Sequence, residues 1–229
     1  MKPCLLIDTS MWGLVVGLGT ETGLLDFSYF PDQRAVARAM TQYVEELLLR
    51  NGISREDLAQ IRVSQGPGSF TGIRMGLAWA YGFSLGSPNI PLVGLSSLEA
   101  IAQELHAQRA AGQTRTAVFL ENKGAAGYVT VVDEETATYA CEISENRILP
   151  LTGDPASEHV RWVRPWAALE AVSWAQDAGR ALHESEYVQL VLHGMLRHRE
   201  SSDGAVPMPR YLRSSTAEEA LEKKKGSPI

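Results

Sequence analysis

The 229-residue sequence predicts an α/β protein of two lobes, each built on a mixed sheet flanked by helices. Three short strand-like runs come first, helices and strands then alternate, and the same order starts again near residue 116. A chain of this length buries the core of one large domain or of two smaller lobes. We therefore expect a first lobe over residues 1–105, a second, more divergent lobe over 106–213 and a charged tail over 214–229.

The first lobe is expected to begin with strands and to continue with alternating helices and strands. Short β-rich runs predict the strands: Cys4–Asp8, Trp12–Gly19, Leu24–Phe30, Ile61–Ser64 and Pro91–Gly94. Apolar residues at i, i+4 and i+7 predict an amphipathic helix from about Asp32, its N-cap, to Arg50. One further helix is expected to open at the glycine-rich segment 66–72 and to reach about Leu85. Another is expected over Ser96–Ala107.

The second lobe repeats this order of elements without a visible repeat of residues. Its expected strands are Thr116–Leu120, Tyr128–Asp133, Thr136–Ile143 and His159–Val163. Two helices are expected at about Trp166–Leu182 and Ser185–Arg197. For the charged residues 218–225 we expect a solvated, frayed terminus, with a partner-binding tail as the alternative.

Composition and charge narrow the class of protein. The net charge of −6 argues against autonomous binding of nucleic acid, because such binding depends on a basic surface. The apolar run Met75–Phe83 is too short to span a bilayer, and no signal peptide is expected. Cys4 and Cys141 read as reduced thiols of a cytoplasmic protein.

The central feature of the sequence is a glycine-rich loop between a strand and a helix. Gly66, Pro67 and Gly68 predict a turn, and Ser69 or Thr71 supplies the N-cap oxygen of the helix that follows. Free amides at a helix N-terminus favour an anion, although the loop lacks the lysine of a P-loop and the spacing of a dinucleotide fingerprint. The alternative is a structural turn that lets strand and helix pack closely.

No constellation of catalytic residues is visible in the sequence. The five histidines form no His-x-x-x-His or His-Glu-x-x-His pair, so we expect no bound metal. Ser69 lacks the Gly-x-Ser-x-Gly context of a nucleophile elbow. We therefore predict no catalytic residues and no cofactor.

Four segments resemble one known family. Nine residues, Gly66–Arg74, read Gly-Pro-Gly-Ser-Phe-Thr-Gly-Ile-Arg and resemble the signature of the bacterial TsaB (YeaZ) family. Leu5–Ser10, Pro91–Glu99 and Pro209–Arg213 resemble its opening strand and turn, the strand and helix after the loop, and its closing Pro-x-Tyr-Leu-Arg. The resemblance implies the two-lobed actin-like fold of sugar kinases, Hsp70 and actin. It also implies a part in forming threonylcarbamoyladenosine in tRNA.

The resemblance further implies which chemistry this chain lacks. Asp8, Thr9 and Ser10 lie where the actin-like fold has its first phosphate-binding turn, while Glu121–Gly124 lacks the second. Two phosphate turns clamp the nucleotide in that fold, so loss of one removes charge stabilisation that phosphoryl transfer needs. The catalytic relative TsaD carries a histidine metal motif on its first-lobe helix, whereas Arg34–Met40 offers no ligands here.

The expected function is therefore that of a non-catalytic subunit that binds and activates a TsaD-type transferase. The resemblance implies a TsaE-type ATPase as a further partner, a homodimer when the chain is alone, and contact with tRNA only through the complex. The alternatives are an ATP-binding actin-fold kinase or ATPase and a glycoprotease-like peptidase. Candidate partner-binding residues lie on two first-lobe helices: Met40, Tyr43, Leu47, Gly72, Met75, Gly76, Trp79 and Phe83. Truncation of Trp79 to alanine is expected to weaken association more than it lowers the melting temperature.

Overall fold

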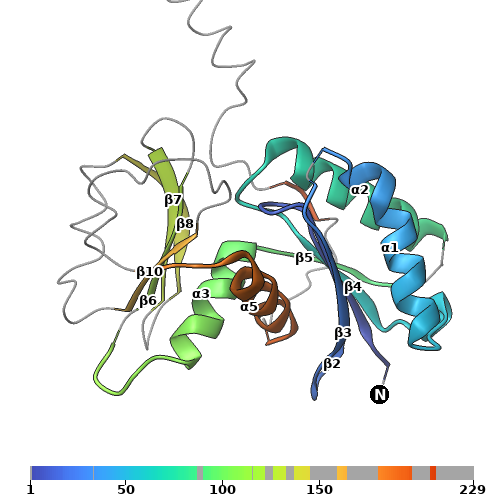
Figure 1. Cartoon of the computed structure of the whole chain (residues 1–229), viewed down its shortest axis with the longest axis horizontal. Helices are drawn as coiled ribbons and strands as arrows, with labels where there is room; N and C mark the ends of the chain where they lie inside the picture. Colours follow the sequence, from blue (N-terminus) through green and yellow to red (C-terminus); the bar gives the residue numbers. More distant parts are fainter. Residues whose placement is uncertain are drawn as a thin grey trace, which may run out of the picture.

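The computed structural model shows two five-stranded sheets with two helices between them (Figure 1). It describes residues 2–32, 34–86, 90–114, 116–121, 126–132, 137–144, 159–163, 180–197 and 207–209. The strand order is β3-β2-β1-β4-β5 in the first sheet and β10-β9-β6-β7-β8 in the second. In both sheets three antiparallel strands are extended by parallel ones, so the halves share one topology.

The first sheet is built around β1, whose side chains are buried on both faces. Its strands are β1 (Cys4–Asp8), β2 (Leu14–Thr20), β3 (Gly23–Phe30), β4 (Gln60–Ser64) and β5 (Leu92–Leu95). Leu5 and Ile7 pack under α1 and α2, while Leu6 faces α3 and α5. The period-2 alternation of a strand therefore places neighbouring residues of one apolar run in two separate cores.

Two helices cover the outer face of this sheet. They are α1 (Val36–Arg50) and α2 (Phe70–Gly86), and a short 3₁₀ turn, η1 (Arg55–Asp57), follows α1. The expected start of α1 at Asp32 is wrong. The Asp32 carboxylate accepts the Arg34 amide at 3.0 Å and its carbonyl accepts the Ala35 amide at 3.1 Å, so Asp32 closes a turn that precedes the helix.

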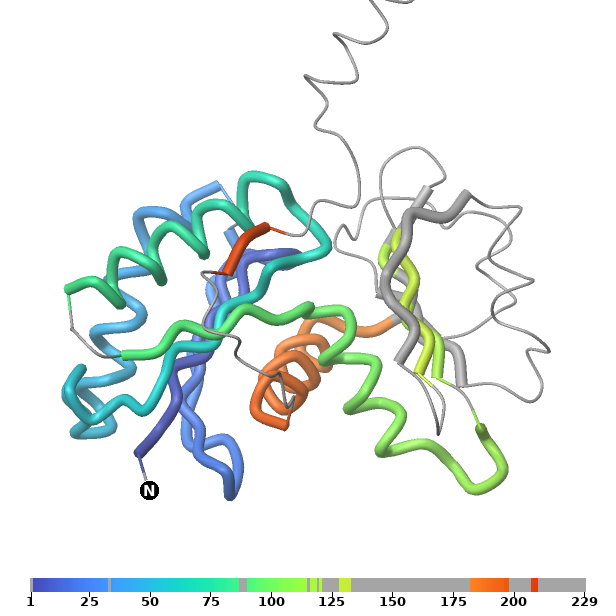
Figure 2. Tube along the Cα trace, turned by 180° about the vertical axis from the view of Figure 1, so that it is seen from behind, coloured from blue at the N-terminus to red at the C-terminus, as the bar shows by residue number. Residues whose placement is uncertain are grey.

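The inner face carries α3 (Ser97–Ala107) and α5 (Glu184–Arg197), which lie side by side between the sheets (Figure 2). Leu192 and Leu196 of α5 pack over Gly17 and Gly19 of β2, where an added Cβ would leave too little room for them. Arg62 of β4 donates to the last carbonyls of α5, at 2.5 Å to Met195 and 2.9 Å to Leu196. A helix from the second half of the chain therefore completes the first-lobe core.

The second sheet contains β6 (Thr116–Glu121), β7 (Ala126–Val132), β8 (Ala137–Ser144), β9 (His159–Val163) and β10 (Arg180–Ala181). Arg180 and Ala181 correct the helix expected to reach Leu182, because they pair in parallel with Arg161 and Trp162 of β9. Residues 164–179, the rest of that expected helix, and the charged segment 218–225 lie outside the described residues.

The remaining bounds differ from the expected ones by at most two residues, and those of β1 and β9 are as expected. Strand β2 starts at Leu14 because Gly13 sits at φ +78°, against the Phe30 and Pro31 backbone, where no Cβ would fit. Residues 207–209, red in Figure 2, return to the first sheet, where Gln65 donates to the Met208 carbonyl at 2.6 Å. None of the helices within the described residues is long and apolar enough to cross a membrane.

Candidate functional site

The structure brings the two predicted phosphate elements, the Asp8–Ser10 turn and the glycine-rich loop, into direct contact. The Ser69 amide donates to the Ser10 carbonyl at 2.6 Å. The Thr9 hydroxyl donates to the Gly72 carbonyl in the first turn of α2 at 2.7 Å. Ser69 is the N-cap of α2, since its hydroxyl accepts the Gly72 amide at 3.2 Å. The loop therefore fastens α2 to the end of β1.

The glycines permit this close packing. Gly68 sits at φ +149°, and a Cβ there would overlap the Ser10 carbonyl. A Cβ at Gly72 would overlap the Thr9 carbonyl oxygen, and one at Gly76 would overlap the Thr9 hydroxyl. Larger residues would push loop and helix away from the turn. This packing favours the structural turn among the two interpretations of the loop.

A buried polar cluster surrounds the end of β1. Asp8 is 1% exposed, and its carboxylate accepts the Ser10 amide at 3.2 Å and the Ser10 hydroxyl at 2.6 Å. The Tyr187 hydroxyl of α5 donates to the second carboxylate oxygen. The Ser10 hydroxyl also lies 3.0 Å from that of Ser97, the first residue of α3. Strand β1, the turn after it, α3 and α5 therefore meet at this cluster.

Tyr187 belongs to this cluster although sequence reasoning did not select it. Its side chain is fully buried, and its ring makes an edge-on contact with Trp12 at 4.5 Å between centroids. Burial, followed by the negative charge of Asp8, raises the pKa of Tyr187 well above its usual value. The hydroxyl therefore stays protonated and donates. Nothing in the α5 sequence distinguishes Tyr187 from an ordinary core residue.

The described residues do not fit a nucleotide at this turn. Both Asp8 oxygens and the Ser10 hydroxyl are engaged within the chain, and Thr9 and Ser10 are completely buried. A phosphate placed against the turn would have to displace the side chains of α3 and α5. The second predicted phosphate turn, residues 122–124, lies outside the described part of the chain. Across the described residues, no group of three or more His, Cys, Asp or Glu side chains could hold a metal ion.

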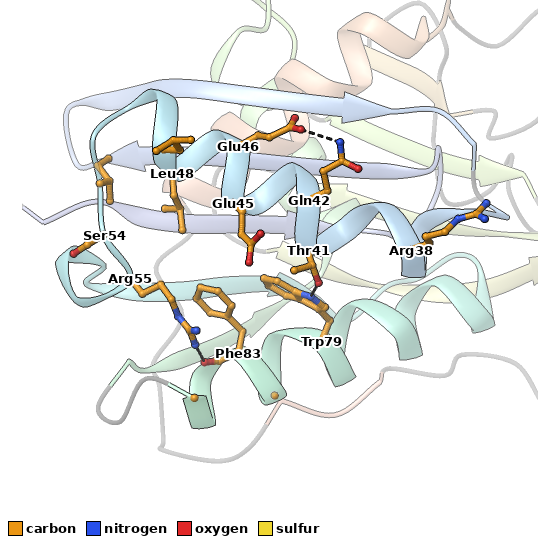
Figure 3. A pocket seen from close by; sticks show the side chains of 14 residues that line it. Arg38, Thr41, Gln42, Glu45, Glu46, Leu48, Ser54, Arg55, Trp79 and Phe83 are labelled. Carbon is orange, nitrogen blue, oxygen red and sulfur yellow. Dashed lines mark hydrogen bonds between the residues drawn. The ribbon is translucent and has the colours of Figure 1, made fainter.

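A second candidate site is a groove of about 1120 Å³ on the outer face, between α1, α2 and η1 (Figure 3). Trp79 donates from its indole nitrogen to the Thr41 hydroxyl at 2.9 Å and stacks on Phe83 at 4.8 Å between centroids. The Arg55 guanidinium lies 4.1 Å from the centre of the Phe83 ring and donates to the Phe83 carbonyl at 3.1 Å. The floor of the groove is therefore aromatic and capped by a cation.

Large apolar side chains are exposed on the two helices of this face. Leu49 of α1 is 81% exposed and lines the groove. Leu85 and Tyr81 of α2 are 65% and 45% exposed. Arg38, Glu45 and Glu46 add both signs of charge to the lining (Figure 3). Exposed apolar residues flanked by charges are typical of a protein–protein interaction surface.

Several known proteins similar to this chain are named for one tRNA modification. Residues 32–142 match the model of the family TsaD, tRNA N6-adenosine threonylcarbamoyltransferase. The tRNA threonylcarbamoyladenosine biosynthesis protein TsaB of Escherichia coli is 26% identical over 202 residues, which cover 84% of this chain and 83% of that protein. TsaB of Bacillus subtilis is 36% identical over 99 residues, 43% of this chain and 42% of the relative. The chain is therefore similar to the proteins of the TsaB (YeaZ) family.

A solved structure supports the fold of this chain. An uncharacterized protein from Pseudomonas aeruginosa with similarity to peptidase YeaZ superposes with a TM-score of 0.68 at 22% identity, over 93% of this chain and 100% of that one. The repeated topology of the two sheets agrees with that likeness. The chain therefore has the fold of that YeaZ-like protein.

The structure separates the predicted partner-binding residues into two groups. Tyr43, Met75, Trp79 and Phe83 are partly buried around α1 and α2. Met40 and Leu47 are wholly buried under α1, because the apolar stripe of that helix faces the sheet, and Gly72 and Gly76 are buried against Thr9. These four contact their own chain. The exposed Leu49, Tyr81 and Leu85 were not among the predicted residues.

Proposed function

We propose that this chain is a non-catalytic subunit in the formation of threonylcarbamoyladenosine in tRNA, which binds and activates a TsaD-type transferase. The observation that carries the proposal is the exposure of large apolar side chains on α1 and α2, with Leu49 81% and Leu85 65% exposed. An isolated domain gains nothing from leucines in water, whereas a partner would bury them. The relatives named as biosynthesis proteins of this nucleoside supply the pathway.

The internal engagement of the Asp8–Ser10 turn supports an accessory role. Its hydrogen-bonding groups are directed to Tyr187 and Ser97 of the same chain rather than to a cleft. We propose that the transferase performs the chemistry and that tRNA meets this acidic chain only through the complex, since a net charge of −6 disfavours direct binding.

The proposal extends to partners and organisation. We propose that residues 1–105 supply the helices that bind the partner and that the same face forms a homodimer when the chain is alone. A TsaE-type ATPase would join the complex, and the assembly would act in the cytoplasm. The groove lining carries Arg38 and Arg55 beside Glu45 and Glu46. Charged residues of the transferase, or of a second copy of this chain, could therefore form ion pairs around the apolar centre.

Reconstitution tests the function directly. Purified chain is combined with a TsaD-type transferase, the ATPase and the substrates, and the modified nucleoside in tRNA is measured with and without this protein. We expect modification to depend on the chain. Equal modification in its absence would overturn the proposal. Calorimetry of the isolated chain with Mg-ATP is expected to show no tight binding, and tight binding would instead favour an actin-fold enzyme.

Trp79 needs a more careful design than the sequence suggested. Its indole packs within the chain, through the hydrogen bond to Thr41 and the stack on Phe83, so truncation to alanine lowers the stability of the free protein as well as its affinity. Leu85→Ala is the better probe in the reconstituted assay, because this side chain is 65% exposed in the free chain. We expect Leu85→Ala to lower complex formation without unfolding the subunit.

A further inference from the structure

The turn between β1 and β2 is hydrogen-bonded to both α2 and α5. On the α5 side, the Tyr187 hydroxyl donates to the Asp8 carboxylate and lies 3.5 Å from the Ser10 hydroxyl. These groups are 1% exposed or less. Tyr187 stands 179 residues from Asp8 in the sequence, so this contact joins the two ends of the fold.

On the α2 side, the same turn is bound at several points. Thr9 donates to the Gly72 carbonyl at 2.7 Å, and Ser10 accepts the Ser69 amide at 2.6 Å. The loop is tied on to α3, because the Ser97 amide donates to the Gly66 carbonyl at 3.1 Å. A displacement of the Asp8–Ser10 turn would therefore also displace the glycine-rich loop and the N-terminal end of α2.

Asp8 depends on Tyr187 for the satisfaction of its second oxygen. Ser10 supplies both of its hydrogen bonds to the first oxygen, Oδ1, whereas the tyrosine reaches Oδ2. A buried carboxylate oxygen that loses its donor retains the cost of desolvation without compensation. The turn is then expected to open toward water or to rearrange, since either movement hydrates the oxygen.

We propose that Tyr187 is a positioning residue that holds the Asp8–Ser10 turn, and through it the glycine-rich loop and the start of α2, in their closed arrangement. The hydroxyl makes the hydrogen bond that holds the turn, and the packing of the ring keeps the hydroxyl in place. This coupling links the second half of the chain to the helix that bears Trp79 and Phe83. It does not depend on the identity of any partner.

Hydrogen exchange on the full chain tests the proposal. The reporters are the amides of Ser69 and Ser97, which donate to Ser10 and Gly66. Tyr187→Phe keeps the ring and removes the hydroxyl, and we expect these amides to exchange about 10- to 100-fold faster. The matched control is Val191→Ala, which removes buried apolar atoms from the same helix and leaves the hydroxyl in place. In the control we expect the two reporters to keep the exchange rates of the natural chain.

Two results would overturn the proposal. Unchanged exchange of both reporters in Tyr187→Phe would show that the hydroxyl does not hold the turn. Equal acceleration in Tyr187→Phe and Val191→Ala would show that Tyr187 contributes only general stability. If Tyr187→Phe does not fold, Ser97→Ala replaces it, because this change removes the 3.0 Å contact to Ser10 from the other side of the cluster. Faster exchange of the Ser69 amide is then expected, and unchanged exchange refutes the coupling.

Discussion

Leu49→Ala is the sharpest test of the outer face of α1 and α2. Leu49 is 81% exposed in the free chain, so its truncation takes little from the folded monomer. Exposed substitutions away from caps and buried networks change the free energy of unfolding by about 0.5 kcal/mol or less. The helix propensity of alanine is at least as favourable as that of leucine, so the substitution does not weaken α1. A change in affinity caused by Leu49→Ala can therefore be measured without a large change in the stability of the free chain.

The expected loss of affinity follows from the exposed area. Truncation of leucine to alanine removes three carbon groups, worth about 0.8 kcal/mol each when fully buried. Scaled by the 81% that is exposed before association, a complete burial of Leu49 by a partner gives about 2 kcal/mol. This free energy corresponds to a roughly 30-fold rise in the dissociation constant.

The assay is titration calorimetry of a TsaD-type subunit with the natural chain, Leu49→Ala and a matched control. Leu25→Ala is that control, because Leu25 is also more than half exposed but lies on β3 rather than on α1 or α2. The control is expected to bind like the natural chain. If Leu49→Ala binds with unchanged affinity, the partner does not cover this part of the face. If both variants weaken binding equally, the effect is not local to the face.

Three further predictions concern stability and are read from urea unfolding. Gly76→Ala should lower the free energy of unfolding by about 1–3 kcal/mol, since its Cβ has no room, whereas Gly82→Ala on the same helix, in open space, should raise it by about 0.5–1 kcal/mol; equal effects would refute the packing argument. The hydrogen bond from Arg50 lowers the pKa of Asp26 to about 2, so its stabilisation is present above about pH 4 and lost as the pH falls through 2. Asp26→Asn should flatten that acid loss by at most about 1 kcal/mol, because the pair is partly exposed. The raised pKa of Tyr187 contributes stability that is present below about pH 10 and is lost as the pH rises further, so Tyr187→Phe should unfold with a weaker dependence on alkaline pH than the natural chain.

The strands and most helices could be predicted because their signals are local. The run Leu5–Ile7 is apolar throughout, and the chain around Gly66 and Gly68 has the composition of a turn. Asp32 shows the limit of such signals. Its side chain serves a turn or a helix N-terminus equally well, and the structure uses it for the turn.

The predicted partner-binding residues lie on α1 and α2, but the structure buries several of them within the chain. Met40 and Leu47 share the stripe that a helix buries, and the stripe faces the sheet of the same chain. The exposed Leu49 and Leu85 carry no periodic signal, because an apolar residue outside the stripe looks like an exception. Which apolar residue remains in water depends on what the rest of the fold covers.

The sequence by itself determined the resemblance to the TsaB family, the order of elements and the glycines that let α2 approach β1. The tertiary structure alone decided that Asp8 meets Tyr187 and that α5 completes the first-lobe core. The physical reason is separation along the chain. Turn conformation and side-chain period act over a few residues, whereas burial of a carboxylate beside a phenol 179 residues away depends on how distant elements pack.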